Sequence, residues 1–504
     1  MRGLMRVTCL TSLFKPLRLL SWCALLCLLE TKSFGVNLER IRKAIFKVQV
    51  VSQNPRANQP WLHRPARSSS GSGFYIGDGL IMTNAHVVAR GKFITVLRDG
   101  IDRAIRAEVQ YIAHDCDLAL IKPIDSSVFE GLTPLVMGNM PRLQSPVATI
   151  GYPKGGEQIS ITKGVVSRIG YRRYVHSGYQ QHLLVQVDSA INSGNSGGPV
   201  LQGRQVVGVA FQSNITAENT GYIIPPPVVQ RFLIDVKDGK YDGHPQDGIF
   251  TMKGATSNPS TAKFHQLLKP AGVKVSFVAP WSSAYQIIQP RDILLKMDGF
   301  PIGVDGKVNF LGERVSFHVL SDLRQKGETI PITLQRGQTK IETKMTAGPS
   351  AQHYQPTNTY GIRPRYLVFA GMIFSTLNRD FLKSWGKRWY RDSPATLRYL
   401  NKYSWWDTTY QTASDIIIFN ARLPDRINNW SDRYRSLPLE SLNQIKIKSL
   451  AQLDKLLESS SEKYFVFKFF NQPEPLIIPS AEARSNHNKI LEKYQVKPEK
   501  WLHH

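Results

Sequence analysis

Short apolar runs, regularly interrupted by turn-forming residues, limit more than any other feature how this chain can fold. Between residues 38 and 240 these runs are short or alternate with polar residues, and Gly, Pro, Asn and Asp separate them. Examples are GSGFYIGDGLIMTN, PVATIGYP, HLLVQVD and QVVGVAFQ. Runs of this length and spacing predict an all-β sandwich or barrel. After three consecutive prolines, residues 228–236 are expected to form a short closing helix.

The rest of the chain divides at polar, turn-rich segments. Its length of 504 residues suggests about three domains. Residues 237–248 (KDGKYDGHPQDG) predict a linker, and a second block follows with strand candidates such as VKVSFVAP and TIPITLQRG. A third block begins near residue 361 and contains YLVFAGMIF, SDIIIFNARL and YFVFKFF. The charged tail after Pro479 is expected to be loose.

The N-terminus has the pattern of an export signal. Basic residues precede an uncharged apolar run, Leu19–Leu29, which is shorter than the roughly 20 residues needed to span a bilayer. Small residues at 33 and 35 suit a signal peptidase, so residues 1–35 are predicted to be a signal peptide. An uncleaved anchor and an organelle transit peptide are the alternatives. Three of the four cysteines lie before residue 30, which would leave Cys116 alone and rule out a disulfide framework.

The composition is strongly basic. The 64 Lys and Arg residues against 38 Asp and Glu residues give a net charge of +26, and removing five basic residues and one acidic residue with the predicted signal peptide would leave +22. Such a charge favours acidic partners or surfaces. No helix-turn-helix, zinc-finger, RNP or basic-zipper string is present, so specific nucleic-acid binding is not expected. Because the basic residues are spread over all blocks, peripheral association with an anionic envelope surface is the simpler expectation.

Three short strings carry the chemistry: TNAHVV around His86, HDCDLAL around Asp117, and GNSGGP around Ser196. A serine hydroxyl needs a histidine to take its proton, a carboxylate to orient that imidazole, and backbone N–H groups to hold the oxyanion. Glycines beside the serine permit the tight turn that directs these amides. Alternatively, Ser196 is a turn serine, His86 a half-buried histidine and Asp117 a turn cap. A metal bound by residues 114–117 is not expected, because adjacent positions give poor ligand geometry.

The strings SGSGFYIGDGLIMTNAHVV, DCDLALIK, GYPKGGEQISITKGVVS, INSGNSGGPV and GYIIPPPVV, in this order and spacing, resemble the HtrA/Deg family of serine proteases. The resemblance implies a mainly β chain with a chymotrypsin-like double β-barrel protease domain over residues 36–240. It implies His86 as general base, Asp117 as its orienting partner and Ser196 as nucleophile. It further implies an oxyanion hole from the backbone of three residues and a specificity pocket lined by three others, respectively Gly194, Asn195 and Ser196, and Val209, Ala210 and Phe211.

The two later blocks resemble the PDZ domains that are fused to these proteases. QPRDILLKMDG and GETIPITLQRG resemble a PDZ (α+β) domain, here predicted over residues 245–348. The resemblance suggests that Gly248, Ile249 and Phe250 receive a peptide C-terminus, while a plain domain-entry turn is the alternative. LNQIKIKSL resembles part of a divergent second PDZ-like domain over residues 360–480 that lacks a glycine of the pattern, so a structural role is expected for it, before a tail over residues 481–504.

These resemblances favour the plant-type Deg branch, and the predicted signal peptide favours a bacterial exported version, periplasmic or secreted. The expected function is ATP-independent cleavage of unfolded or damaged proteins by a serine endopeptidase. A chaperone or peptide-binding protein with an idle protease site is the alternative. The resemblance also implies a homo-oligomer, a trimer or a multiple of trimers, and neither a cofactor nor a metal is expected. The polar, aromatic loop at residues 171–178 is expected to sense a bound peptide or a neighbouring PDZ domain, or to be an ordinary solvated loop.

Overall fold

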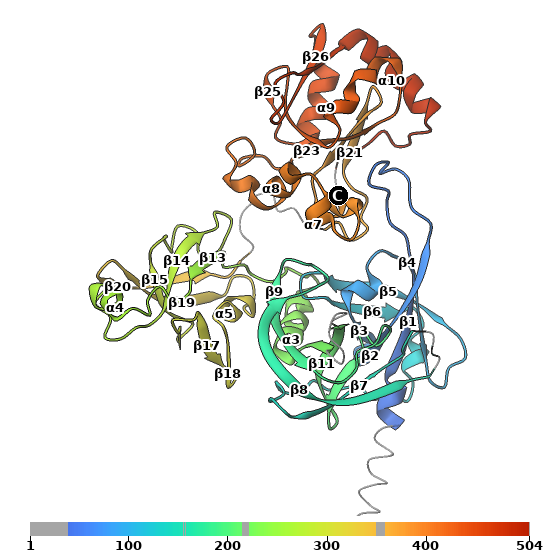
Figure 1. Cartoon of the computed structure of the whole chain (residues 1–504). Helices are drawn as coiled ribbons and strands as arrows, with labels where there is room; N and C mark the ends of the chain where they lie inside the picture. The colour runs from blue at the N-terminus through green and yellow to red at the C-terminus, as the bar shows by residue number, and fades with distance from the viewer. Residues whose placement is uncertain (1–38, 155, 157, 214–220, 349–357, 503–504) are drawn as a thin grey trace, which may run out of the picture.

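A computed structural model describes residues 39–154, 156, 158–213, 221–348 and 358–502. The predicted signal peptide lies outside these residues. Figure 1 shows three units: a barrel domain (residues 39–240), a middle domain (residues 245–348) to one side of it, and a third domain (residues 358–502) at one end of the molecule. The prediction of a mainly β chain with a double barrel and two further α+β units is confirmed.

The first barrel closes because its strands alternate apolar and polar side chains. In β1, Phe46, Val48 and Val50 are buried while Lys47 and Gln49 point away from the core. The six strands are hydrogen-bonded in the order β1-β2-β3-β6-β5-β4. Their bounds are β1 Ile45–Ser52, β2 Arg67–Gly77, β3 Leu80–Thr83, β4 Gly91–Arg98, β5 Ile105–Ala113 and β6 Leu118–Pro123.

A second closed barrel follows, with the strand order β10-β11-β12-β9-β8-β7. Its strands are β7 Pro146–Gly151, β8 Ser160–Arg173, β9 Gln181–Val187, β10 Pro199–Gln202, β11 Gln205–Ser213 and β12 Gly221–Ile224. The expected closing helix is α3 (Pro226–Asp235), which begins with prolines that suit a first turn lacking N–H partners. Its residues Val228, Val229 and Phe232 are fully buried.

The middle domain contains a sheet in the order β13-β14-β15-β19-β20, with β16 paired to β15, and a separate β17–β18 hairpin. One apolar cluster includes both Phe232 of the barrel domain and Ile249 of the middle domain, so the two domains share a core. The elements are β13 Ile249–Met252, α4 Pro259–Phe264, β14 Val273–Val278, β15 Ile293–Met297, β16 Phe300–Pro301, β17 Lys307–Phe310, β18 Glu313–Ser316, α5 Val319–Asp322, β19 Thr329–Arg336 and β20 Thr339–Thr346.

The third domain has an eight-stranded sheet, ordered β27-β26-β24-β23-β22-β21-β28 with β25 paired to β24. Helix α9 begins at the Ser449 cap and buries Leu450, Leu453 and Leu457 against this sheet's core. The elements are β21 Tyr366–Phe369, β22 Met372–Thr376, α6 Arg379–Leu382, α7 Trp389–Asp392, α8 Ala395–Tyr403, β23 Ile417–Arg422, β24 Leu437–Leu442, β25 Ile445–Lys446, α9 Leu450–Ser459, β26 Tyr464–Phe469, β27 Leu476–Pro479, α10 Ser480–Lys493 and β28 Lys500–Trp501.

The charged tail differs from its prediction. Helix α10 buries Ala483 and Ile490, and β28 pairs with β21. These apolar positions lie seven residues apart and therefore share one helix face, which the many charges between them conceal. The tail is thus part of the third domain.

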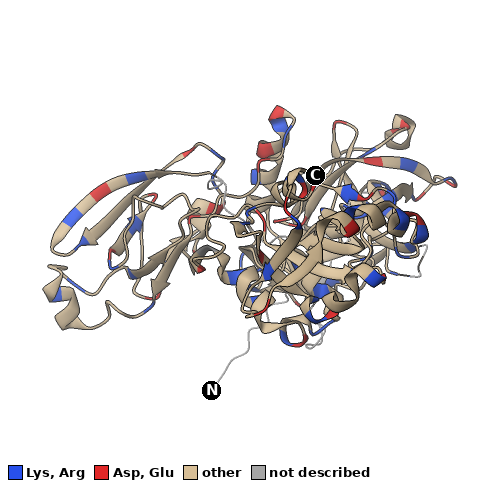
Figure 2. Cartoon of the chain, turned by 90° about the horizontal axis from the view of Figure 1, so that it is seen from above, with Lys and Arg blue, Asp and Glu red and all other residues tan. Residues whose placement is uncertain are grey.

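The third domain also contacts the barrel domain. The ring of Trp61, between β1 and β2, packs against Tyr366 with centroids 5.8 Å apart, and the Asn420 side-chain amide donates to the Ala57 carbonyl at 2.6 Å. Figure 2 shows the Lys and Arg positions spread along all parts of the chain rather than gathered in one segment. Within the described residues, none of the helices combines the length and the apolar character needed to cross a membrane.

Candidate active site

The turn that carries Ser196 joins the second barrel to the first. The Ser72 N–H donates to the Ser196 carbonyl at 2.8 Å, and the Ser72 hydroxyl donates to the Gly194 carbonyl at 2.7 Å. Gly197 has φ of 85°, and a Cβ there would lie 2.1 Å from the Ser72 carbonyl oxygen. Only glycine fits so close an approach with a positive φ. The sequence around Ser196 therefore holds this serine between the two barrels.

Backbone orientation in this turn creates a place for an oxyanion. The Ser193 carbonyl accepts from the Lys154 N–H at 2.7 Å, and in a trans peptide the Gly194 N–H must point the opposite way. No described residue accepts a hydrogen bond from the Gly194 or Ser196 N–H. The Asn195 N–H instead donates to the Asn192 carbonyl at 3.0 Å. The expectation for Asn195 is thus corrected, because its amide is consumed in closing the turn.

His86 and Asp117 meet at the opposite wall. His86 lies on α2 (Ala85–Val88), and its Nδ1 is 2.7 Å from Asp117 Oδ2, while its backbone N–H donates to Asp117 Oδ1 at 2.8 Å. The Asn84 side chain donates to the Asp117 carbonyl at 2.9 Å. The carboxylate is 1% exposed, whereas the imidazole is 33% exposed. Asp117 therefore holds the ring from behind and leaves Nε2 for a partner on the open side.

Opposing effects set the proton affinities of this pair. Burial disfavours the imidazolium, but the charge and hydrogen bond of Asp117 outweigh it and raise the pKa of His86. Burial also favours the neutral acid, yet the charge and hydrogen bonds of His86 hold the pKa of Asp117 below its usual value. A buried carboxylate that stays charged is what a histidine base requires to become imidazolium in a transition state.

The Ser196 hydroxyl is turned away from this pair. It donates to the Phe211 carbonyl at 3.4 Å, and within the described residues no hydrogen bond joins it to His86. Catalytic hydrogen bonds are often long or misaligned before substrate binds. A rotation of the Ser196 side chain is therefore the step that would bring nucleophile and base together.

The three residues expected to line the specificity pocket lie on β11, directly beside the turn that carries Ser196. The Gly197 N–H donates to the Ala210 carbonyl at 2.7 Å, and the Ala210 N–H donates to the Gly198 carbonyl at 3.0 Å. Val209, Ala210 and Phe211 are all buried. The structure thus brings this strand to the site through its backbone and places its side chains in apolar clusters.

The expected carboxylate-binding loop lines a cavity of about 390 Å³ between the middle domain and the barrel domain. Ile249 is buried and Phe250 is 52% exposed, and Gly248 (φ of 64°) packs against Ser282. The Ile249 N–H, however, donates to the Asp247 carboxylate of the same chain at 3.0 Å. One backbone amide of this loop is therefore already hydrogen-bonded to a carboxylate of the same chain, a contact that the sequence did not predict.

Asp247 has further donors. His318 Nδ1 lies 2.8 Å from its Oδ2, and the Ser321 hydroxyl donates to the same oxygen at 2.6 Å. Burial favours the neutral acid, but His318 and these hydrogen bonds hold the pKa of Asp247 below its usual value. An internal anion thus sits where the groove was expected to receive a peptide's terminal carboxylate.

Sequence reasoning also missed an aromatic cluster beside His86. His176 lies with its ring centroid 6.1 Å from that of His86, and its Nε2 is 2.9 Å from His114 Nδ1. Tyr360 of the third domain stacks on His114 at 3.7 Å with the rings 4° from parallel. Burial, then the neighbouring His176, lowers the pKa of His114 to about 3. The loop at residues 171–178 was singled out by composition, but nothing local marks Tyr360.

One group among the described residues has the arrangement of metal ligands. His182, His244 and Asp322 are buried, and their ligand atoms lie within 4.8 Å of one another. Both ring Nδ1 atoms are already at hydrogen-bond distance from Asp322 Oδ1, 2.9 Å for His182 and 3.0 Å for His244. A hydrogen-bonded ion pair accounts for His182 and Asp322, whereas the buried Nε2 of His244 has no hydrogen-bond partner among the described residues.

Comparison with known proteins identifies two domain families in the chain. Residues 71–209 match the family described as trypsin-like peptidase domain, and residues 355–500 match the family described as PDZ domain. The fold and the site define a serine endopeptidase of the trypsin-like class. The solved structure of the HtrA-type protease AlgW with a tripeptide is 21% identical, with a TM-score of 0.49, and covers 63% of this chain and 97% of that one.

The chain belongs to the Deg/HtrA family of Do-like serine proteases. Protease Do-like 4, mitochondrial, from Arabidopsis thaliana is 32% identical, over 92% of this chain and 84% of the relative. Protease Do-like 2, chloroplastic, from the same plant is 33% identical, over 84% of this chain and 69% of the relative. The predicted resemblance to the plant-type branch is confirmed.

The predicted bacterial export is wrong. The relatives named above carry mitochondrial and chloroplastic designations, which contradicts a periplasmic or secreted location. The error has a physical origin. Basic residues near the N-terminus occur in organelle transit peptides as well as in secretory signal peptides, so the basic start alone does not distinguish the two.

Proposed function

We propose that this endopeptidase cleaves unfolded or damaged proteins without ATP, by a Ser196–His86–Asp117 acyl-enzyme mechanism. The observation that carries the mechanism is the 2.7 Å contact between His86 Nδ1 and the buried Asp117 carboxylate, opposite a serine held in a glycine turn. Because Nδ1 donates to Asp117, Nε2 is the nitrogen left to take a proton. The remaining steps follow from this tautomer.

In the first half-reaction, His86 Nε2 takes the proton from Ser196 Oγ while Oγ bonds to the substrate carbonyl carbon. The Gly194 and Ser196 N–H groups hold the oxyanion that forms. The carbon–nitrogen bond then breaks, and the proton on Nε2 passes to the leaving amine. In the second half-reaction the same nitrogen takes a proton from a water molecule while the water oxygen bonds to the acyl carbon. The bond from that carbon to Ser196 Oγ then breaks, and the proton on Nε2 passes to Oγ.

The substrate class is proposed from what the chain lacks and carries. The sequence contains no GxxxxGK[ST] phosphate loop, so substrates must already be locally unfolded to reach the site. The Ser196 turn is hydrogen-bonded to Ser72 of the first barrel, which supports a site at the junction of the two barrels. We also propose a homo-oligomer, a trimer or a multiple of trimers, on the resemblance to the family.

We propose an organellar location. The relatives named above are mitochondrial and chloroplastic proteins. The first 35 residues hold five basic residues against one acidic residue, a balance that also suits a transit peptide. Import of the full chain into isolated mitochondria and chloroplasts, followed by protease protection, tests this assignment.

Cleavage of casein by the purified chain, without ATP, tests the enzymatic proposal. Ser196→Ala should abolish cleavage, while Ser126→Ala, an exposed serine outside the site, should retain it. Mass in solution, measured on the same samples, tests the oligomer. Suppression of client aggregation by both wild type and Ser196→Ala, with cleavage by neither, would support the chaperone alternative and contradict the proposal.

A further inference from the structure

The catalytic carboxylate sits at the end of a short turn, His114–Asp117, between β5 and β6. Asp117 has φ of 57°, in the left-handed region that residues other than glycine rarely adopt. Such a backbone persists only where its surroundings over-determine it. The groups that hold this turn therefore bear on where the Asp117 carboxylate lies.

Asp115, two residues before Asp117, is anchored by the linker to the middle domain. Its Oδ1 accepts from the Tyr241 hydroxyl at 2.6 Å, and its Oδ2 accepts from the His244 N–H at 2.9 Å. The Cys116 N–H closes the turn onto Oδ1 at 2.9 Å. Burial favours the neutral acid, but His244, His182 and these hydrogen bonds hold the pKa of Asp115 below its usual value. The linker thus holds the His114–Asp117 turn in place through hydrogen bonds to the charged Asp115 side chain.

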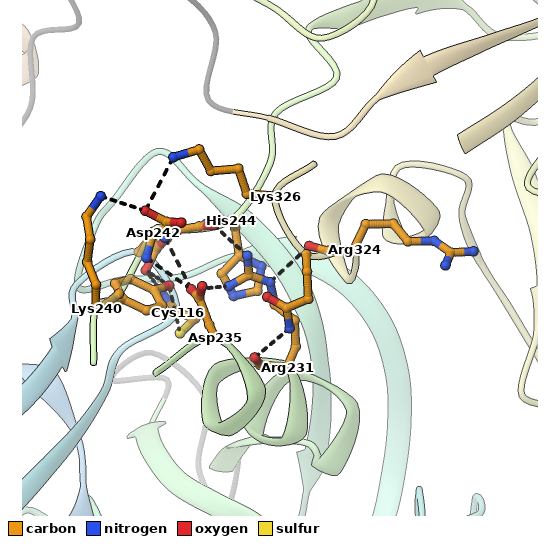
Figure 3. Close-up of polar contacts among 12 residues, drawn as sticks. Cys116, Arg231, Asp235, Lys240, Asp242, His244, Arg324 and Lys326 are labelled. Atoms are coloured by element: carbon orange, nitrogen blue, oxygen red, sulfur yellow. Dashed lines mark hydrogen bonds and ion pairs between the residues drawn. The ribbon is translucent and has the colours of Figure 1, made fainter. Parts of the chain in front are cut away.

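The linker itself is fixed on the barrel domain and the middle domain together. Arg231 of α3 is 2% exposed, and it pairs with Asp235 at 3.0 Å and donates to the Gly243 and Arg324 carbonyls. Figure 3 shows Arg231, Asp235 and His244 converging with Cys116 of the catalytic turn. Any movement of the middle domain therefore also affects the linker.

A second path reaches the same turn from the middle domain. Asp322, at the end of α5, accepts from His182 Nδ1 at 2.9 Å, and His182 Nε2 donates to the Asp115 carbonyl at 3.0 Å. Only imidazolium donates from both nitrogens. Burial opposes this form, but the charge of Asp322 outweighs it and raises the pKa of His182. Asp322 and His182 are both buried, so neither contact is shared with bulk water.

We infer that Asp115 and His182 are positioning residues for Asp117, and that the middle domain holds the catalytic turn in its active shape through Asp322. This inference rests on the triad proposed above. Contacts within the chain thus link the middle domain to the turn whose Asp117 carboxylate orients His86. This link needs no ligand bound to the middle domain.

The test measures kcat, KM and the pH profile of casein cleavage for full-length Tyr241→Phe and Asp322→Asn. Asp305→Asn, which removes an exposed ion pair confined to the middle domain, is the matched control. A displaced Asp117 lowers the pKa of His86, which otherwise faces Asp117 and the ring of His176. We therefore expect kcat to fall about tenfold for Asp322→Asn with KM nearly constant, and the acid limb to move to lower pH. Asp322→Glu should recover part of the loss.

A merely structural role gives a different result. Loss of folded enzyme scales the whole profile without moving its midpoint, and the folded fraction from circular dichroism corrects for it. An unmoved acid limb in both variants overturns the inference, as does one bound zinc ion per wild-type chain, because a metal requires a neutral His182. Absence of Ser196-dependent cleavage in the wild type contradicts the proposed function instead, so the two failures are distinguishable.

Discussion

Single atoms decide what this site can do. His86 is oriented by one carboxylate, and the nucleophile turn admits no side chain at Gly197. The strings around His86, Asp117 and Ser196 predicted the candidate residues, of which His86 and Asp117 are in contact, while no hydrogen bond among the described residues joins the Ser196 hydroxyl to His86. They could not predict that the Asn195 N–H donates to the Asn192 carbonyl, or that the Ser196 hydroxyl donates to the Phe211 carbonyl. Each of these contacts depends on the rotation of a single bond.

The substitution Asp117→Asn tests the role of a single residue, the carboxylate that orients His86. The general base must be neutral, and Asp117 raises the pKa of His86, so wild-type kcat/KM should fall as the pH drops through a value above 6.5. With asparagine we expect kcat to drop about 10⁴-fold, and the acid limb of the residual activity to move to lower pH. Stopped assays between pH 5 and 9 measure both. An unchanged kcat would contradict the assignment of Asp117.

At the scale of elements, the loop between β8 and β9 depends on the third domain. Arg379 of α6 donates to the Gly178 carbonyl at 2.9 Å and to the Ser177 carbonyl at 3.3 Å, and the Asn358 side chain donates to Ser177 at 2.9 Å. This loop holds His176 beside His86. Its composition indicated a sensing role, but its partner could not be predicted, since long-range docking leaves no periodic pattern in a sequence.

Arg379→Ala should loosen this loop. Hydrogen bonds from a charged group contribute about 1.5–3 kcal/mol, so we expect amide exchange at Tyr174 and Gly178, whose N–H groups are bonded within the loop, to quicken about 10- to 100-fold. Arg388→Ala, an exposed arginine of the same domain, is the control. Hydrogen–deuterium exchange read by mass spectrometry measures the change, and equal protection in both variants would show that Arg379 does not order the loop.

At the scale of the whole molecule, the three units share contacts that no single unit's sequence reveals. Strand patterns predicted a β sandwich or barrel and strands in both later blocks, because alternation and turn residues are local, whereas the double barrel was expected from the resemblance to the family. The sequence did not predict the ion pair between His182 and Asp322, which are both buried between the barrel domain and the middle domain. Each of them is an isolated polar residue in its own strand or helix.

The stability that this pair provides should depend on pH. His182 has a raised pKa when folded, so its contribution is complete below the unfolded value of 6.5 and is lost as the pH rises through the folded value. The Asp322 pKa is depressed, and its share is lost only in strong acid. The Tm of wild type minus that of Asp322→Asn should therefore be larger at pH 6 than at pH 9, by differential scanning calorimetry. A constant difference would contradict the ion pair.

The Asp247 carboxylate in the groove of the middle domain has a consequence for the chain ends that the reaction produces. Every peptide bond that this enzyme hydrolyses produces a fresh chain end bearing a carboxylate. In the groove the Ile249 amide, the Ser321 hydroxyl and His318 are already engaged by Asp247. A new chain end that binds in this groove through the same donors must therefore displace the Asp247 carboxylate from them.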